Sequence, residues 1–145
     1  MAEAGSAVKE FFEAYVRATD SADSSFFGSA YGETFMFASP GAVQAVKRDD
    51  FLKVVPKRRA FFAAAGLVAS EVRGLEETLL DEHHLLVKAR WTFRFESDPS
   101  RPMIVEGAAT YVLRRQDDRL QIVFQLDHQD LTKRVQELGL LPHQS

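Results

Sequence analysis

The stretch LLVKARWTFRF, residues 85–95, alternates apolar with polar or charged side chains along most of its length. One set of alternate positions is apolar throughout: Leu85, Val87, Ala89, Trp91, Phe93 and Phe95. The positions between them include Lys88, Arg90, Thr92 and Arg94. Successive side chains of a β-strand point to opposite faces of its sheet. The pattern therefore predicts an antiparallel strand with one buried face and one solvated face.

Further strands are expected on both sides of this stretch. They cover residues 34–38, 68–80, 103–114 and 120–128. Polar turn segments at residues 81–84, 97–102 and 116–118 separate the later strands from one another. Because these turns are short, we expect consecutive strands to pair as hairpins and to form an antiparallel meander.

Most of the predicted helices precede the meander in the sequence. Apolar side chains at helical spacing predict a helix over residues 6–19, and a short second helix follows around Phe26. A third helix begins near Asp49 or Asp50 and ends at Gly66, with a kink at Pro56 because proline removes a backbone donor. Asp130 caps a short last helix. Helices largely segregated from strands along the chain indicate an α+β fold.

The composition indicates a single globular domain over residues 1–145. The net charge is -3 with both signs interspersed, so no basic field favours nucleic acid as a partner. The chain has no cysteine, which suits a reducing cytoplasm. No apolar run has the length of a membrane span, and the first ten residues lack the order of a signal peptide. We therefore expect a cytoplasmic protein that does not associate with membranes.

Three local features resemble one known superfamily. They are Ala14-Tyr15-Val16 with the turn at residues 21–23, the strand 34–38 ending in Ser39-Pro40-Gly41, and the closing hairpin 111–125. Together with the order of helices and strands, they resemble the nuclear transport factor 2-like superfamily, which includes SnoaL-like cyclases and ketosteroid isomerases. The resemblance implies a cone-shaped, strongly curved antiparallel sheet packed on N-terminal helices around a pocket. It also implies a homodimer formed through the outer sheet face.

The ketosteroid isomerase mechanism is only partly matched. Tyr15 matches the helix-one tyrosine that donates to an oxyanion in that family. The position of the carboxylate base is Ser39, and the position of the protonated acid is near Ala109. Since that mechanism needs a base and two acids, the resemblance disfavours Δ5-3-ketosteroid isomerisation.

His128 is the candidate catalytic residue. It ends the last expected strand in phase with Ile122, Phe124 and Leu126, while Asp127 is expected on the opposite face. If the family's pocket lies on the face of Ile122, an imidazole at its rim can act as an acid or a base. The alternative interpretation is a solvated or helix-capping histidine.

The candidate ligand-binding residues are mostly aromatic. With twelve Phe, three Tyr and one Trp, the chain has rings enough to line a hollow or to fill a core. The residues expected to line the pocket are Tyr15, Tyr31, Trp91, Tyr111 and Phe124. The alternative is that these rings fill the core and satisfy their polar atoms locally.

The outer face of the sheet and the third helix suggest association with other proteins. Ile104, Ala108, Val112 and Val123 give the outer face an apolar surface that favours a homodimer. On the same face, Glu106 is expected to pair with Arg90 or Arg94 rather than to act in catalysis. The basic residues between positions 47 and 59 are most simply a solvated helix face.

The sequence leaves three functions open. The first is a domain that binds a small, largely apolar molecule, and the second is an enzyme of the cyclase, isomerase or dehydratase type that uses His128. The third is a protein-association module. No cofactor is expected, since the chain has no Gly-rich phosphate loop. No metal is expected either, because the adjacent His83 and His84 lack a third ligand at suggestive spacing.

Overall fold

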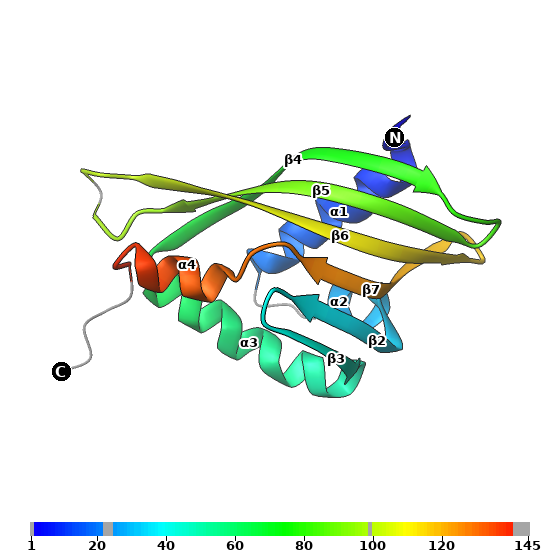
Figure 1. Ribbon diagram of the computed structural model, residues 1–145, viewed down its shortest axis with the longest axis horizontal. Helices are drawn as coiled ribbons and strands as arrows, with labels where there is room; N and C mark the ends of the chain where they lie inside the picture. The colour runs from blue at the N-terminus through cyan, green and yellow to red at the C-terminus, as the bar shows by residue number, and fades with distance from the viewer. Residues whose placement is uncertain (1, 22–24, 99, 141–145) are drawn as a thin grey trace.

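The computed structural model describes residues 2–21, 25–98 and 100–140 and shows an α+β fold (Figure 1). The helices are α1 (Ser6–Thr19), α2 (Ser25–Ala30), α3 (Arg48–Ala64) and α4 (Leu131–Glu137). The strands are β1 (Ala2–Glu3), β2 (Tyr31–Ser39), β3 (Ala42–Lys47), β4 (Leu67–Leu79), β5 (His84–Phe95), β6 (Met103–Gln116) and β7 (Arg119–Asp127). The predicted meander is confirmed, with β4 to β7 in consecutive hairpins.

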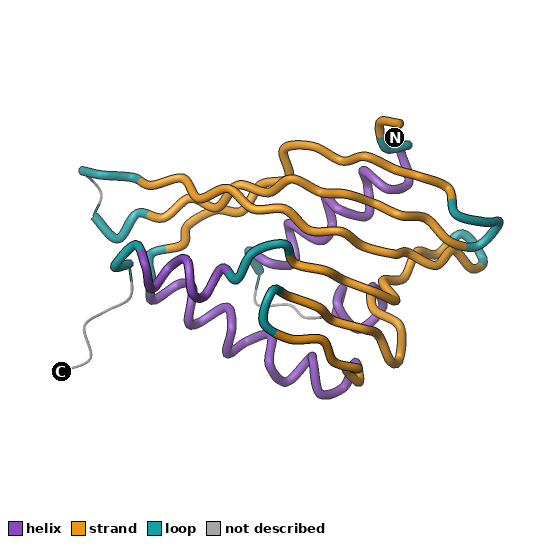
Figure 2. The backbone as a smooth tube through the Cα atoms, viewed as in Figure 1, coloured by secondary structure: helices purple, strands orange, loops and turns teal. Residues whose placement is uncertain are grey.

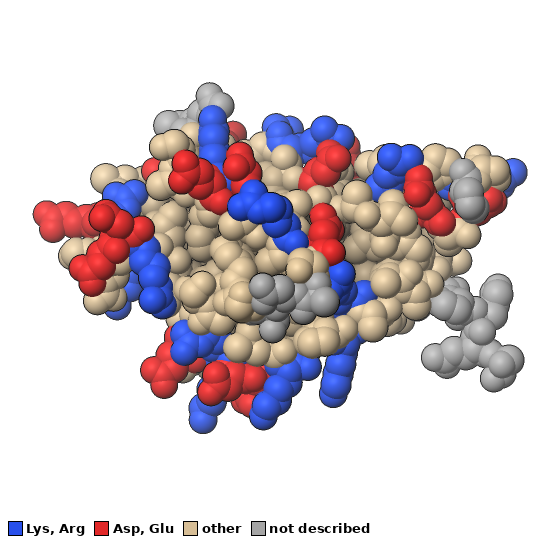
Figure 3. All heavy atoms as spheres, turned by 180° about the vertical axis from the view of Figure 1, so that it is seen from behind, with Lys and Arg blue, Asp and Glu red and all other residues tan. Residues whose placement is uncertain are grey.

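All described strands join one curved, unclosed sheet in the order β1-β4-β5-β6-β7-β2-β3. The pairings are antiparallel except for one, in which β2 runs parallel to β7. This parallel pair brings the amino-terminal half of the chain beside its last strand. Figure 2 shows the long strands β4, β5 and β6 running together, with α3 and α4 alongside. Seen from behind, the surface carries basic and acidic side chains side by side (Figure 3).

The helices cover the apolar face of the sheet, and α1 crosses behind β5 and β6 (Figure 1). The alternation in β5 is confirmed, because its apolar set from Leu85 to Phe95 is buried or half-buried. Two apolar clusters result. The larger packs α1 and α2 on the sheet, and the smaller packs the end of α3 and α4 on the far ends of β5 and β6. Phe93 contacts both clusters.

The helix does not restart at Pro56, since α3 runs as one helix from Arg48 to Ala64. Proline removes one backbone donor and crowds the carbonyl four residues earlier. Packing on both sides of Pro56 keeps the helix continuous, because Phe51, Leu52 and Val55 reach the larger cluster while Phe62 reaches the smaller one. Gly66 follows with a φ of 98°, a left-handed conformation that favours glycine.

A β-bulge in β7 decides which side chains point inward. Leu113 pairs with Ile122, whereas the preceding Val112 pairs with Phe124, so Val123 is an extra residue on β7. One extra residue moves every later side chain to the other face of the sheet. Ile122 is therefore buried in the core. Beyond the bulge Gln125 points inward in place of Phe124.

Candidate functional site

Six side chains bring polar atoms together inside the larger apolar cluster. We call them the tyrosine cluster: Tyr15 of α1, Tyr31 of β2, Trp91 of β5, Tyr111 of β6, and Gln125 and Asp127 of β7. Tyr31 is fully buried and Tyr111 nearly so, and Trp91 and Gln125 are also buried. Tyr15 and Asp127 are only half-buried. These two are thus the members that a molecule from solvent would meet first.

Hydrogen bonds link the tyrosine cluster across three elements. The Tyr15 and Tyr31 hydroxyl oxygens are 3.0 Å apart. Tyr31 donates its hydroxyl proton to Gln125 Oε1 at 2.6 Å, and Gln125 Nε2 donates to Asp127 Oδ1 at 3.0 Å. The polar atoms are therefore satisfied by one another inside an apolar surrounding.

Burial and these hydrogen bonds set the acidities of the tyrosines. Burial raises the pKa of Tyr31 and of Tyr111 well above the ordinary tyrosine value. Burial also raises the pKa of Tyr15, but its hydrogen bond with Tyr31 opposes this rise. Tyr15 is thus the tyrosine whose pKa is raised least. Because Tyr31 gives its one hydroxyl proton to Gln125, Tyr15 donates to Tyr31, and it would turn its hydroxyl from Tyr31 to donate to an oxygen of a ligand.

Asp127 is the ionisable carboxyl of the tyrosine cluster. Burial raises its pKa above the ordinary aspartate value, while the hydrogen bond from Gln125 and the charges of Arg58 and His128 oppose the rise. A carboxyl with a raised pKa can give or take a proton nearer to neutral pH than an exposed one. Such perturbed groups concentrate at functional sites, although structural networks also contain them.

Four of the five predicted ligand-binding residues lie together. The ring centroids of Tyr15 and Trp91 are 5.7 Å apart, and those of Tyr15 and Tyr111 are 6.4 Å apart. Tyr31 joins them through its hydroxyl. The prediction that these side chains contact a ligand stays a prediction.

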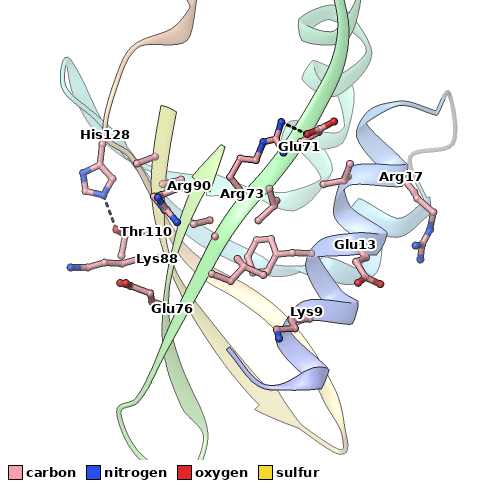
Figure 4. Close-up of a pocket in the computed structure, with 18 residues that line it drawn as sticks. Lys9, Glu13, Arg17, Glu71, Arg73, Glu76, Lys88, Arg90, Thr110 and His128 are labelled. Atoms are coloured by element: carbon pink, nitrogen blue, oxygen red, sulfur yellow. Dashed lines mark hydrogen bonds and ion pairs between the residues drawn. The ribbon is translucent and has the colours of Figure 1, made fainter. Parts of the chain in front are cut away.

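The expected orientation of the last strand is wrong beyond the bulge at Val123. Phe124 pairs with the outward-facing Val112, so it does not join the tyrosines. The ring of His128 lies on the side of the sheet away from α1, where its Nε2 is 2.7 Å from Thr110 Oγ1 (Figure 4). Asp127, expected on the outside, belongs to the tyrosine cluster instead.

Sequence reasoning therefore missed Gln125 and Asp127. The sequence gives one indication that these two residues share a face. Gln125 and Asp127 are two positions apart and alternate with the apolar residues Phe124 and Leu126. That spacing places them on one face, but the bulge decides that the face is the inner one.

An open hollow of about 1050 Å³ lies beside the tyrosine cluster. The α1 side is lined by Lys9, Phe12, Glu13, Val16 and Arg17, and residues 71–76 of β4 line it as well. The hollow extends to His128 and Thr110 on the other side of the sheet (Figure 4). None of the five predicted ligand-binding residues lines it, but the ring centroid of Phe12 is 5.0 Å from that of Tyr111. The floor of the hollow thus adjoins the tyrosine cluster.

One expectation about an ion pair on the outer face is tested by the structure. Arg94 does not pair with Glu106 but with Glu96, at 2.7 Å. Among the residues that the structure describes, no group of three or more His, Asp or Glu side chains could hold a metal ion.

Comparison with known proteins identifies the family. A family model described as NTF2-like protein (DUF6841) matches residues 2–130. The chain belongs to this NTF2-like family. No curated protein sequence matches the chain at a significant level. In the described part of the chain, no helix is both long and apolar enough to cross a membrane.

Solved structures agree with the family assignment. An NTF2-like protein of unknown function from Shewanella oneidensis is 18% identical, with a TM-score of 0.67 over 84% of this chain and 96% of its own. An NTF2-like protein with a cystatin-like fold from Novosphingobium aromaticivorans is 16% identical, with a TM-score of 0.68 over 94% and 87%. A protein from Shewanella frigidimarina, provisionally assigned as a ketosteroid isomerase, is 14% identical, with a TM-score of 0.66 over 84% and 94%. At these identities the likeness shows the fold alone.

Proposed function

We propose that this NTF2-like protein binds a small, largely apolar molecule against the tyrosine cluster. The hydrogen-bonded series Tyr15–Tyr31–Gln125–Asp127 inside an aromatic core is the observation that carries the proposal. Ligand sites are typically apolar and contain a few converging polar groups. In this site the rings would contact the apolar body of the ligand, and Tyr15 would donate to one of its oxygen atoms.

The cost of the polar groups supports a role beyond packing. A buried polar group costs free energy unless it is hydrogen-bonded, and even a satisfied network gains little over apolar side chains of the same shape. Keeping an aspartate beside three tyrosines therefore lowers stability relative to an all-apolar core. A function that needs these atoms, such as ligand recognition, explains why the core contains them.

Calorimetry with 2-naphthol and with naphthalene tests this proposal, because the two probes differ only by a hydroxyl group. We expect 2-naphthol to bind more tightly, and Tyr15→Phe to weaken its binding about fivefold through loss of one hydrogen bond. Thr34→Val, at an exposed position of β2, is the matched control and should leave binding unchanged. If neither probe binds or raises the melting temperature, the proposal fails.

A second candidate function is acid-base catalysis with Asp127 as the proton-transferring group. In the ketosteroid isomerase pattern the position of the protonated acid matches Ala109, and Asp127 is the residue that pairs with Ala109 in the sheet. Asp127 would thus place a carboxyl next to the position of the pattern's protonated acid, and since Ser39 stands where the pattern has its base, Asp127 itself would have to take the proton. Tyr15 would stabilise negative charge on the substrate oxygen, as the oxyanion donor does in that pattern.

Proton exchange on a ketone tests the catalytic candidate directly. 2-Tetralone in deuterated water exchanges its α-protons slowly, and the protein would accelerate this exchange. Asp127→Asn should abolish the acceleration, whereas His128→Ala should leave it intact because its ring lies on the outer face. Exchange that is unaffected by Asp127→Asn contradicts the assignment.

The protein would form a homodimer through the outer face of its sheet. Sheet register aligns Leu86, Val112, Phe124 and Met36 across four strands on that face. Ile104 on the same face is 56% exposed. Because a row of large apolar side chains favours association, light scattering should give twice the mass of the chain, and Val112→Lys should give a monomer. A wild-type monomer at high concentration would contradict this.

The cytoplasm remains the proposed location of the protein. Mixed surface charge and the absence of cysteine from the chain support it. Cell fractionation followed by detection with an antibody against the protein would test this location. Recovery of the protein in the membrane or secreted fraction would contradict it.

A further inference from the structure

Arg58 is a cation of α3 held over an aromatic ring and near the tyrosine cluster. It is an exposed residue, and its guanidinium carbon is 4.8 Å from the centroid of the Phe62 ring. Its charge acts on two members of the cluster, Tyr15 and Asp127. These two are the least buried members of the cluster. A charged group of a ligand at the cluster would therefore meet the field of Arg58 first on this side.

The ring below Arg58 belongs to the smaller apolar cluster, which adjoins the larger one through Phe93. Phe62 is buried in the smaller apolar cluster, and Phe93 packs against that cluster as well as against the larger one. The rings of Phe93 and Trp91 are stacked, with centroids 6.0 Å apart and planes at 6°. An apolar molecule bound against Trp91 and Tyr15 would therefore extend towards Arg58.

No described residue forms a hydrogen bond or a close ion pair with the guanidinium of Arg58, in contrast to the two other arginines of α3. Arg48 donates to the Tyr31 carbonyl at 3.2 Å, and Arg59 donates to the Asp20 carbonyl at 2.9 Å. For Arg58 the described part of the chain offers only the face of Phe62. Its N–H edges thus remain available for an oxygen ligand.

We propose that Arg58 is a specificity-determining residue that holds an anionic group, such as a carboxylate, of the ligand. The inference rests on the proposed function, since it concerns the same ligand. The ligand class is then an amphipathic anion, with an apolar body on the aromatic rings and its charged group at Arg58. A planar guanidinium offers paired donors that match a carboxylate, and an aromatic ring under one face holds it in position.

A matched pair of probes tests this proposal. 2-Naphthoate and 2-naphthamide have the same ring system and nearly the same shape, but only the first carries a negative charge at neutral pH. We expect the wild-type protein to bind 2-naphthoate about fivefold more tightly, which is typical of a partly exposed ion pair. Higher salt should reduce this preference, because it screens exposed charges.

Arg58→Gln should remove the preference by weakening 2-naphthoate binding while leaving 2-naphthamide unchanged. Arg58→Lys should keep part of the preference. Lys57→Gln removes one positive charge from the neighbouring exposed position and is the control for a general change of charge. These substitutions alter an exposed position of α3, and the unchanged amide affinity reports an intact fold.

The outcomes separate the two proposals. If both probes bind equally and Arg58→Gln changes neither, the role of Arg58 is overturned while the binding proposal stands. If Lys57→Gln lowers the preference as much as Arg58→Gln does, the effect is general electrostatics and the assignment to Arg58 is also overturned. If neither probe binds and 2-naphthol also fails, the proposed function itself is wrong.

Discussion

The two apolar clusters under the sheet differ in what they contain, although β5 and β6 run through both. The larger one surrounds the tyrosine cluster, with three hydroxyls, an amide and a carboxyl among its rings. The smaller one, between α3, α4 and the far ends of β5 and β6, consists of apolar side chains such as Phe95 and Val135. The same strands thus support a polar site at one end and an all-apolar core at the other.

This difference suggests a division of roles. The smaller cluster contributes free energy of folding through burial of its apolar side chains. The larger one includes groups that lower the gain from burial but can recognise a ligand. Substitutions in the smaller cluster should therefore change stability and spare binding, whereas substitutions at the tyrosine cluster should change binding more than stability.

Phe95→Ala should give the largest loss of stability. Phe95 is fully buried in the smaller cluster, so truncation removes its transfer free energy and leaves a cavity. We expect the free energy of unfolding to fall by about 3–5 kcal/mol. Urea denaturation measures it, with Lys53→Ala at an exposed position of α3 as control. A loss no greater than that of the control would mean that the smaller cluster is not a stabilising core.

Tyr31→Phe should cost less, about 1–2 kcal/mol, because it removes the donor to Gln125 and leaves that buried amide oxygen unpaired. The ring and its packing remain. Binding of 2-naphthol should weaken in the same variant, since Tyr15 loses its neighbour. Denaturation and calorimetry on one sample compare the two effects. A variant that is less stable but binds normally would place Tyr31 in the structural core.

Asp130→Ala tests how α4 closes the smaller cluster. Asp130 is the N-cap of α4, where its carboxylate accepts from the Lys133 backbone N–H at 3.1 Å. Loss of such a cap costs about 1 kcal/mol. The control is Glu137→Ala in the same helix, whose contact with Arg134 is 3.8 Å long and exposed. Equal melting temperatures of the two variants would contradict this role for the cap.

Asp127→Asn should have the smallest effect, and one of opposite sign. Burial raises the pKa of Asp127 in the folded protein, so the folded state binds its proton more tightly than the unfolded state does. The protonated carboxyl of Asp127 therefore adds to the free energy of unfolding at low pH. This contribution is lost as the pH rises from about 4, the pKa of an aspartate in the unfolded chain, through the raised pKa of the folded state. Asparagine cannot ionise and avoids this loss.

The measurement for Asp127 is the difference in unfolding free energy between the variant and the wild type as a function of pH. It should grow in favour of Asp127→Asn as the pH rises and then level off. Glu106→Gln, at an exposed position of β6, is the control. A difference that stays constant with pH would show that Asp127 titrates alike in the folded and unfolded states.

Much of the fold follows from local patterns in the sequence. The alternation of residues 85–95 predicts β5 and its buried face, and helical spacing predicts α1 over Ser6–Thr19 as observed. Asp130 caps α4 as expected. These features depend on residues close together in the chain, so they can be deduced without knowledge of the partner strands.

The candidate site is only half predictable in this way. Tyr15, Tyr31, Trp91 and Tyr111 lie on predicted inward positions or at helix ends, and the structure brings them together. Pairing of β2 with β7 brings Tyr31 to Gln125 across 94 positions of sequence. No periodicity within one segment contains that information.

The sequence by itself determined where the strands and helices lie and which face of β5 is buried, because each depends on neighbouring side chains alone. Only the tertiary structure decided that Asp127, and not His128, points inward. The reason is the bulge at Val123, in a strand that pairs with β6 on one side and with β2 on the other. A single inserted residue then exchanges the two faces of the strand from that position onward.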